Sequence, residues 1–214
     1  MKIRRAPSHW LRPPGPVAPG LRIGLLGGSF NPAHEGHVHV SETALKRLGL
    51  DYVWWLVTPH NPLKGVADLA PLEDRVAVAK KLVRHPRIVV MDVERQLGTR
   101  YSFDTLSALQ RRFPQVKFVW LMGSDNLQIF RRWHRWAELA ARVPVAVIQR
   151  PGSILAALHA KPMHRFACRR CRGNLADAAP PAFVILDGRR NPQSATAIRA
   201  QTLEGQALVR AIPL

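Results

Sequence analysis

A pair of adjacent glycines and two histidines lie close together near the start of the chain, in Gly27-Gly-Ser-Phe-Asn-Pro-Ala-His-Glu-Gly-His37. Glycines at the end of an apolar strand let the backbone turn tightly beside a ligand. His34 and His37 are expected at the start of a helix, where residues three apart share one face. The N–H groups of such a first turn bind phosphate, and imidazoles add further donors. The pattern therefore predicts a phosphate-binding turn that includes both histidines.

The same two histidines could instead be ligands of a metal ion. A third ligand is not evident nearby in the sequence, and His39 is expected to point elsewhere. A Gly-Gly turn, or one histidine at a helix start, is also common in proteins without a ligand there. The combination of two glycines and two histidines favours phosphate binding by this turn.

Apolar runs of strand length alternate with stretches of helical periodicity along the chain. We expect strands at 21–26, 52–57, 87–93, 117–122, 144–149 and 182–186. We expect helices at 34–48, 72–84, 103–112, 133–142 and 195–206, with a polar loop before the third of them. Strands that alternate with helices form a parallel sheet covered on both faces. The sequence therefore predicts an α/β fold with a Rossmann-like, doubly wound parallel sheet, whose ligands bind beyond the carboxyl ends of the strands.

Length, charge and cysteine content limit the class of protein further. The chain has 214 residues, of which 47% are hydrophobic, which is enough for one sizeable core. Its apolar runs are too short to cross a membrane. The net charge of +18 favours anionic partners, but the basic residues are scattered, so charge alone does not favour nucleic acid. Two cysteines form no disulfide framework, which favours a reducing cytoplasm.

Residues 21–214 are expected to form a single domain. Residues 1–20 are basic and rich in proline, which predicts a disordered tail, with a cleaved organellar transit peptide as the alternative. Four potential zinc ligands gather where the sequence shows no clear period: His159, His164, Cys168 and Cys171. A single Cys-x-x-Cys is a weak signal for zinc, so two free thiols are the simpler interpretation.

The phosphate-binding turn is part of a longer motif. The segment from Gly28 to His37 resembles the G-x-F-x-P-x-[HT]-x-x-H signature of the nucleotidyltransferase superfamily, and the form that includes Gly27 resembles the bacterial nicotinate-nucleotide adenylyltransferase family. Further segments resemble the same family in the same order: Trp54–Lys64, Glu94, Tyr101–Leu106, Met122–Leu127, Trp133–Trp136, Arg150–Gly152 and Ser194–Arg199. The resemblance runs from about residue 21 to about residue 206, which makes the expected domain a nucleotidyltransferase domain.

The resemblance implies transfer of AMP from ATP to nicotinate mononucleotide, with nicotinate adenine dinucleotide and pyrophosphate as products. The acceptor phosphate would attack ATP directly, so the reaction needs positioning and charge neutralisation rather than a protein nucleophile. His34, His37 and Arg199 are the catalytic residues that it implies, acting on the ATP phosphates. The ATP-binding residues that it implies are Gly27, Gly28, Ser29, Phe30, Asp125, Ser194, Thr196 and Arg199.

Three of these ATP-binding residues have simpler explanations as well. Ser194 and Thr196 open the last expected helix, where they would hold the β- and γ-phosphates, and helix capping is compatible with that role. Ala195 stands where the family usually has serine, so we assign it no role. Asp125 follows a strand and would accept hydrogen bonds from the ribose hydroxyls, although it could also be a surface aspartate in a loop.

The other substrate would be bound by a flat aromatic ring, helix donors and cations. By the resemblance, Trp133 would stack on the pyridine ring, and groups near Tyr101 to Phe103 would receive the nicotinate carboxylate. Lys64 lies in a proline-rich loop at the end of a strand, where a cation suits phosphate. Arg150 could act in the same way or be a solvated arginine. The expected acceptor-binding residues are Lys64, Tyr101, Ser102, Phe103, Trp133 and Arg150.

The expected partners are therefore ATP, accompanied by Mg²⁺, and nicotinate mononucleotide. Mg²⁺ keeps water and phosphate ligands, so we expect no metal ligands from the protein. One alternative is nucleotidyl transfer to another acceptor, such as nicotinamide mononucleotide, phosphopantetheine or glycerol phosphate. A second alternative is a nucleic-acid-binding protein on an old nucleotide fold, which would bind with steep salt dependence. The sequence leaves the oligomeric state open, including a homo-oligomer.

Overall fold

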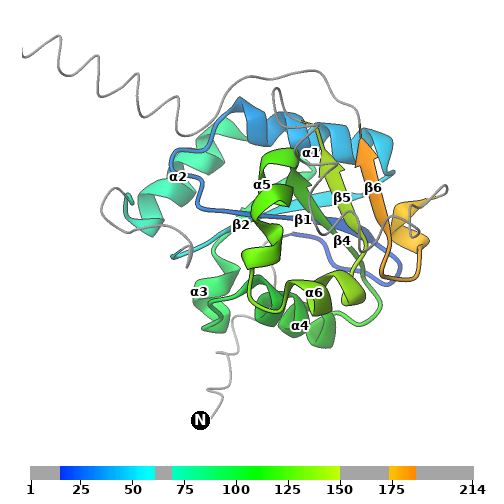
Figure 1. Cartoon of the computed structure of the whole chain (residues 1–214). Helices are drawn as coiled ribbons and strands as arrows, with labels where there is room; N and C mark the ends of the chain where they lie inside the picture. Colours follow the sequence, from blue (N-terminus) through cyan, green and yellow to red (C-terminus); the bar gives the residue numbers. More distant parts are fainter. Residues whose placement is uncertain (1–14, 61–68, 150–173, 187–214) are drawn as a thin grey trace, which may run out of the picture.

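Six strands form one parallel sheet in the order β3-β2-β1-β4-β5-β6 (Figure 1). The computed structural model of the chain describes residues 15–60, 69–149 and 174–186. The strands are β1 Arg22–Gly28, β2 Tyr52–Val57, β3 Ile88–Met91, β4 Lys117–Gly123, β5 Val145–Ile148 and β6 Phe183–Leu186. Every neighbouring pair is parallel, which confirms the predicted sheet.

The two faces of the sheet carry separate apolar clusters, because side chains alternate along each strand. On one face Leu25 of β1 is in register with Trp54 of β2 and with Trp120 of β4, and all three are buried. On the other face Leu26 is in register with Trp55 and Leu121. The strands are buried on both faces, which is why they appear in the sequence as continuous apolar runs.

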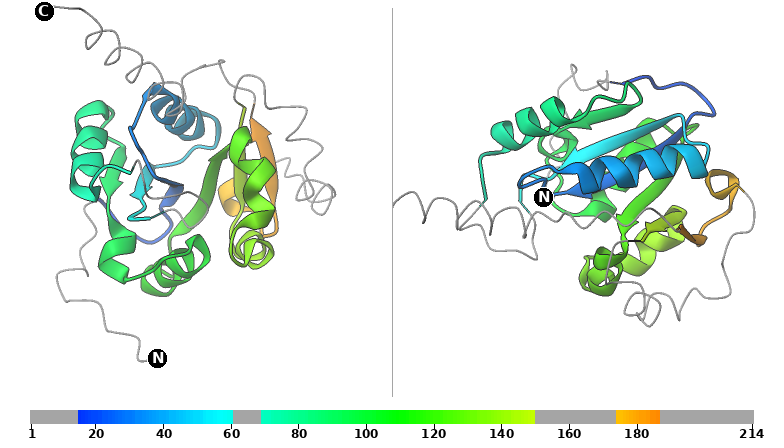
Figure 2. Two further views of the ribbon diagram at one scale, coloured as in Figure 1. Left: turned by 60° about the vertical axis from the view of Figure 1, so that its left-hand side comes forward. Right: turned by 90° about the horizontal axis from the view of Figure 1, so that it is seen from above.

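Helices cover both faces. One face packs against α1 (Glu35–Arg47) and α2 (Leu72–Leu82), and the other packs against α3 (Val93–Leu97), α4 (Ser102–Arg112) and α6 (Trp136–Arg142). Figure 1 shows these two layers, and Figure 2 shows them from two further directions. The remaining helical elements are short: α5 Ser124–Ile129, η2 Phe130–Arg132 and η4 Leu175–Asp177. No helix in the described ranges is long and apolar enough to cross a membrane.

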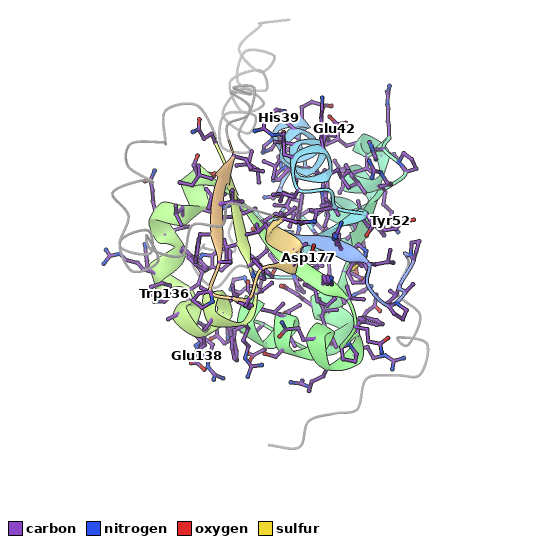
Figure 3. All side chains as sticks on the ribbon, turned by 90° about the vertical axis from the view of Figure 1, so that its right-hand side faces the viewer. His39, Glu42, Tyr52, Trp136, Glu138 and Asp177 are labelled. Atoms are coloured by element: carbon purple, nitrogen blue, oxygen red, sulfur yellow. The ribbon has the colours of Figure 1, made fainter. Side chains whose placement is uncertain are left out.

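The end of the sheet where the strands begin is held by an ion cluster around Asp177, which Figure 3 labels. Asp177 pairs with Arg22 at 2.9 Å and with Lys117, so it joins the first residues of β1 and β4. These cations lower the pKa of the Asp177 carboxyl, the Lys117 hydrogen bond most of all. The carboxyl ends of the same strands lie at the opposite edge of the sheet.

The structure differs from the predicted elements in three places. The expected polar loop contains α3, which begins after Asp92 and ends at Gly98, whose φ of 62° terminates the helix. The expected helix at 133–142 begins only at Trp136. The segment 15–20 packs against the domain rather than forming the end of a tail, since the Gly20 N–H donates to the Gln115 carbonyl at 2.9 Å. The expected helix at 195–206 lies outside the described residues.

Candidate active site

The candidate site lies at the carboxyl ends of β1 and β4. The chain runs from β1 outward to β3 on one side and from β4 outward to β6 on the other, so the order of the strands reverses between β1 and β4. Ligands of open α/β sheets bind at such a switch point. Gly28 ends β1 and Gly123 ends β4, so the histidine turn and Asp125 both lie at this edge.

The predicted histidine pair is the cap of α1. His34 is the N-cap residue, and its Nδ1 atom accepts a hydrogen bond from the Gly36 N–H at 3.1 Å. His37 reaches back, and its Nδ1 atom accepts from the His34 N–H at 3.2 Å. The two ring centroids are 3.9 Å apart. Two imidazoles thus form a reciprocal capping box, a role usually filled by a hydroxyl and a carboxylate.

This capping arrangement fixes which nitrogen of each ring carries the proton. A neutral imidazole has one donor and one acceptor nitrogen, and in both rings the acceptor is Nδ1. The proton therefore lies on Nε2 in His34 and in His37. The first turn of α1 also offers fewer backbone donors than the sequence predicts, because the Gly36 and His37 N–H groups already have partners. The Nε2–H groups are thus the donors best suited to phosphate.

Packing under the pair holds His37 in place. The Phe30 ring stacks on Trp55 with centroids 4.9 Å apart and contacts His37 at 4.6 Å. Trp55 donates from Nε1 to the Ser41 hydroxyl at 2.7 Å, and Ser41 donates to the His37 carbonyl at 2.8 Å. Because the Phe30 ring is buried, a contact of Phe30 with ATP would come from its backbone.

The tight turn after β1 is made by Phe30, whose φ is 46°, rather than by the glycines. Gly27 and Gly28 are needed for space. A Cβ atom on Gly27 would lie 3.3 Å from the Trp120 ring, and one on Gly28 would lie 3.3 Å from the Phe30 ring. The sequence predicts the turn correctly, but the left-handed residue is the one after Ser29.

Asp125 lies in the first turn of α5, directly after β4, rather than in a loop. Its side chain is exposed at the same sheet edge as the histidine pair. Ser124, the preceding residue, is buried. An exposed carboxylate at the end of the central strands is compatible with the expected ribose contact.

The expected acceptor residues Tyr101, Ser102 and Phe103 form the start of α4. Tyr101 is the N-cap residue and has an extended backbone, and no side chain among the described residues caps this helix. The first N–H groups, on Ser102 and Phe103, therefore point out of the helix end, where the dipole favours an anion. Asp104 places one carboxylate in the same turn.

The expected ring-stacking residue Trp133 lies beside this helix start. Trp133 is half-buried and packs edge-to-face on Trp120, with centroids 6.0 Å apart, and on Phe130, at 5.3 Å. The ring of the next residue, His134, packs against that of Tyr101 at a tilt of 31°, with centroids 4.3 Å apart. The structure thus brings Tyr101 and the Trp133 segment together, as an acceptor pocket would require.

The Phe103 side chain is not available to a ligand. It is 3% exposed, and the Arg135 guanidinium lies 3.9 Å from its ring centroid, with that of Arg142 at 5.1 Å. Arg135 has a φ of 52°, which explains why α6 begins only after it. A contribution of Phe103 to acceptor binding would come from its N–H group.

The sequence analysis missed Arg75 of α2. This side chain is 3% exposed and donates to four carbonyls: Ser29 at 2.6 Å, Thr58 at 2.8 Å, Pro59 at 3.1 Å and Ala70 at 2.8 Å. It joins the turn after β1 to the loop after β2. A signal was present, because Arg75 falls on the same helical face as the apolar positions predicted for this helix.

The sequence analysis named Glu94 only among the segments that resemble the family and assigned it no role. It is 4% exposed at the beginning of α3, and burial raises the pKa of its carboxyl to about 7, although hydrogen bonds with Thr58 and Thr105 oppose that rise. A glutamate directly after an expected strand end was the available signal. Desolvation of a carboxyl is the ordinary cause of such a shift.

Five expected site residues lie outside the described residues: Lys64, Arg150, Ser194, Thr196 and Arg199. The same holds for the four candidate zinc ligands His159, His164, Cys168 and Cys171. Within the described ranges, no group of three or more His, Cys, Asp or Glu residues could hold a metal ion. The described part of the site therefore consists of the β1–α1 turn, Asp125, the start of α4 and the Trp133 segment.

Residues 25–201 match the family model described as Cytidylyltransferase-like, which makes this chain, with its parallel sheet and its histidine turn at the switch point, a nucleotidyltransferase. A Parvibaculum lavamentivorans protein named probable nicotinate-nucleotide adenylyltransferase is 52% identical over 189 residues, which cover 86% of this chain and 93% of that protein. A Cereibacter sphaeroides protein of the same name is 53% identical over 180 residues, covering 83% and 96%. The chain belongs to the nicotinate-nucleotide adenylyltransferase family.

A solved structure has the same fold. The nicotinic acid mononucleotide adenylyltransferase of Plasmodium falciparum, complexed with NaAD, superposes with a TM-score of 0.66 and covers 84% of this chain and 83% of that one. Its sequence identity is 15%, so this similarity supports the architecture of the sheet and helices.

Proposed function

We propose that the protein transfers AMP from ATP to nicotinate mononucleotide. An oxygen of the acceptor 5′-phosphate attacks the α-phosphorus of ATP, a new phosphorus–oxygen bond forms, and the bond to the β-phosphate bridging oxygen breaks. The products are nicotinate adenine dinucleotide and pyrophosphate. This direct displacement forms no covalent enzyme intermediate, so the protein has to align two polyanions and neutralise developing charge.

The observation that carries this proposal is the orientation of the histidine pair. Both Nδ1 atoms are engaged by backbone N–H groups, so both proton-bearing Nε2 atoms belong to rings fixed at the switch point. Donors that are held in place before the reaction cost no reorganisation when charge develops on the departing pyrophosphate. His34 and His37 are therefore proposed as the catalytic donors, with Arg199 as a further one.

The ATP is proposed to lie along the β1–α1 turn, with its ribose near Asp125. The backbone of Gly27 to Phe30 would contact the nucleotide, and Ser194 and Thr196 would hold the outer phosphates. Mg²⁺ is proposed to enter with the ATP, bound by the ATP phosphates and water.

The acceptor is proposed to bind between α4 and the Trp133 segment. The uncapped start of α4 supports a site for an anionic ring substituent, because first-turn N–H groups and the dipole favour a carboxylate over a neutral amide. Trp133 would stack on the pyridine ring, with Lys64 and Arg150 near the acceptor phosphate. A cytoplasmic location belongs to the same proposal.

The reaction can be tested by incubating the purified protein with ATP, Mg²⁺ and nicotinate mononucleotide and analysing the nucleotides by mass spectrometry. The expected product is nicotinate adenine dinucleotide, formed in equal amount with pyrophosphate. Release of pyrophosphate without the dinucleotide would contradict the proposal, since ATP would then be cleaved without transfer to the acceptor.

A further inference from the structure

The buried carboxyl of Glu94 lies between the two sides of the candidate site. Its hydrogen-bond partners are the hydroxyls of Thr58, which follows β2, and of Thr105, in the second turn of α4. Its Oε2 atom is buried and has no hydrogen-bond partner among the described residues. Glu94 is therefore the point at which the β2–α2 loop, α3 and the acceptor-side helix meet.

The number of protons in this network can be counted. Thr58 donates to the His60 carbonyl at 3.0 Å and Thr105 to the Tyr101 carbonyl at 3.2 Å, while Thr99 and Thr105 share a bond of 2.8 Å. Together with the two Glu94 contacts these make five hydrogen bonds, for which the three threonine hydroxyls supply only three protons. A carbonyl can only accept, so the hydroxyl protons of Thr58 and Thr105 are already used in hydrogen bonds to the His60 and Tyr101 carbonyls.

The protonation state of Glu94 decides how many of these five hydrogen bonds can have a proton. An ionised Glu94 can only accept, so two of the five bonds would lack a proton. A protonated Glu94 adds one donor, which can give its proton to Thr58 or to Thr105, so that four of the five bonds have a proton. The neutral form therefore satisfies more of the network than the ionised form does.

We infer that Glu94, in its neutral form, is a positioning residue that fixes the start of α4 against the β2–α2 loop. It acts through Thr105, which donates to the Tyr101 carbonyl. Tyr101 is the N-cap residue that precedes the Ser102 and Phe103 N–H groups, which are proposed to bind the acceptor carboxylate. The inference rests on the proposed function for the identity of the acceptor. Burial, which raises the pKa of Glu94 to about 7, supports the neutral form at neutral pH.

Several charged groups lie on the elements around Glu94. Asp92 and Arg95 on either side of it in sequence bond to each other, Nε to Oδ2 at 2.7 Å. Arg75 donates to the Thr58 carbonyl. Asp104 belongs to α4, Tyr101 is the N-cap residue of that helix, and His60 lies in the β2–α2 loop. The experiment therefore compares variants at each pH rather than relying on the wild-type profile alone.

Three variants test the inference: Glu94→Gln, Glu94→Ala and Thr105→Val. Glu94→Gln is neutral and keeps one donor and one acceptor at every pH, so its KM for nicotinate mononucleotide should stay within about threefold of wild type at pH 6.5. Glu94→Ala should raise that KM by roughly tenfold or more, with the KM for ATP changed by less than about threefold. Thr105→Val is nearly isosteric with the wild type and should raise the same KM. It therefore tests the inference even if Glu94→Ala does not fold.

Ser107→Ala is the matched control. Ser107 is a buried hydroxyl on the same helix, but it donates to the Phe103 carbonyl within that helix and belongs to no bond with Glu94. The KM of Ser107→Ala for the acceptor should be within about twofold of wild type, because the two hydrogen bonds that are lost, to the Phe103 carbonyl and from Arg142 at 3.3 Å, do not involve Glu94. Unfolding midpoints of all four variants show which of them are folded.

The pH dependence of the KM for the acceptor distinguishes this role from a purely structural one. The KM of the wild type for the acceptor should rise from pH 6 to pH 8.5, and that of Glu94→Gln should rise less. Equal changes of both substrates' KM in Glu94→Ala and Thr105→Val, or a Glu94→Gln variant as impaired as Glu94→Ala, would overturn the inference. If the wild type uses another acceptor, the proposed function fails, and the same comparison with that acceptor decides the role of Glu94.

Discussion

The Nδ1 atom of His37 accepts a hydrogen bond from the backbone N–H of His34 at 3.2 Å, and the two imidazoles are tilted by 43° with centroids 3.9 Å apart. The two rings thus serve at once as the helix cap and as the proposed phosphate donors. Because the cap uses Nδ1, the orientation of each Nε2–H is set by the fold before any ligand binds.

Replacing His37 by alanine should lower kcat by roughly 10²- to 10³-fold, because one oriented donor to the departing phosphate is lost. The far-ultraviolet circular dichroism should be unchanged, since α1 keeps its apolar face. Steady-state kinetics with saturating ATP and nicotinate mononucleotide measure the effect. His39→Ala is the control, because His39 lies on the same helix but outside the pair, and a loss of kcat equal to that of His37→Ala would refute the role of the pair.

Replacing Trp133 by alanine should raise the KM for nicotinate mononucleotide more than the KM for ATP. A stacked ring contributes about 1–3 kcal/mol, so a rise of roughly tenfold is expected. Trp136→Ala is the matched control, because Trp136 also packs edge-to-face on Phe130, at 5.8 Å. If Trp133→Ala changes only the KM for ATP, the acceptor pocket has been placed at the wrong end of the site.

Replacing Arg75 by methionine should lower the free energy of unfolding by about 3 kcal/mol or more, because four carbonyls lose their donor in a buried place. Arg75→Lys should recover only part of this, since an ammonium lacks the planar fork of the guanidinium. Urea unfolding measures both variants. The control is Arg95→Met, whose exposed ion pairs contribute about 0–1 kcal/mol, and equal losses for Arg75→Met and Arg95→Met would contradict the prediction.

The stability of the protein should depend on pH through Glu94. The folded carboxyl has its pKa raised to about 7 from the ordinary 4.5, so the folded state holds a proton that the unfolded state has released between these values. The stability from this group is therefore fully present below pH 4.5 and is lost as the pH rises to 7, a change of roughly 3 kcal/mol.

Glu94→Gln removes this titration. Relative to wild type, the variant should gain up to roughly 3 kcal/mol of unfolding free energy between pH 5 and pH 8, as measured by urea unfolding at both values. Glu138→Gln provides the comparison, because Glu138 is exposed and paired with Arg135. A difference between Glu94→Gln and wild type that is the same at both pH values would show that Glu94 does not titrate in this range.

The sheet could be predicted from the sequence because its strands are buried on both faces. β2 illustrates this, since the apolar run Tyr52–Val57 coincides with the observed strand. α3 could not be predicted by periodicity, because five residues are too few to show a period. Its capping pattern, Asp92 before the helix and Gly98 at its end, was the better signal.

The histidine pair could be predicted from its spacing, but its hydrogen bonds could not. Nothing in the sequence indicates that each Nδ1 faces a backbone N–H, because that depends on the backbone of His34, which has a φ of −149°. Arg75 and Glu94 were missed for a related reason. Their roles depend on loops that are far apart in sequence and meet only in the folded chain.

The central claim is tested most directly by measuring pyrophosphate release with ATP, Mg²⁺ and one of three acceptors: nicotinate mononucleotide, nicotinamide mononucleotide or phosphopantetheine. We predict a kcat/KM for nicotinate mononucleotide at least about tenfold above the other two, because a carboxylate suits the uncapped start of α4. Preference for either other acceptor would contradict the acceptor site while leaving the histidine turn in place. No release with any acceptor would contradict nucleotidyl transfer itself.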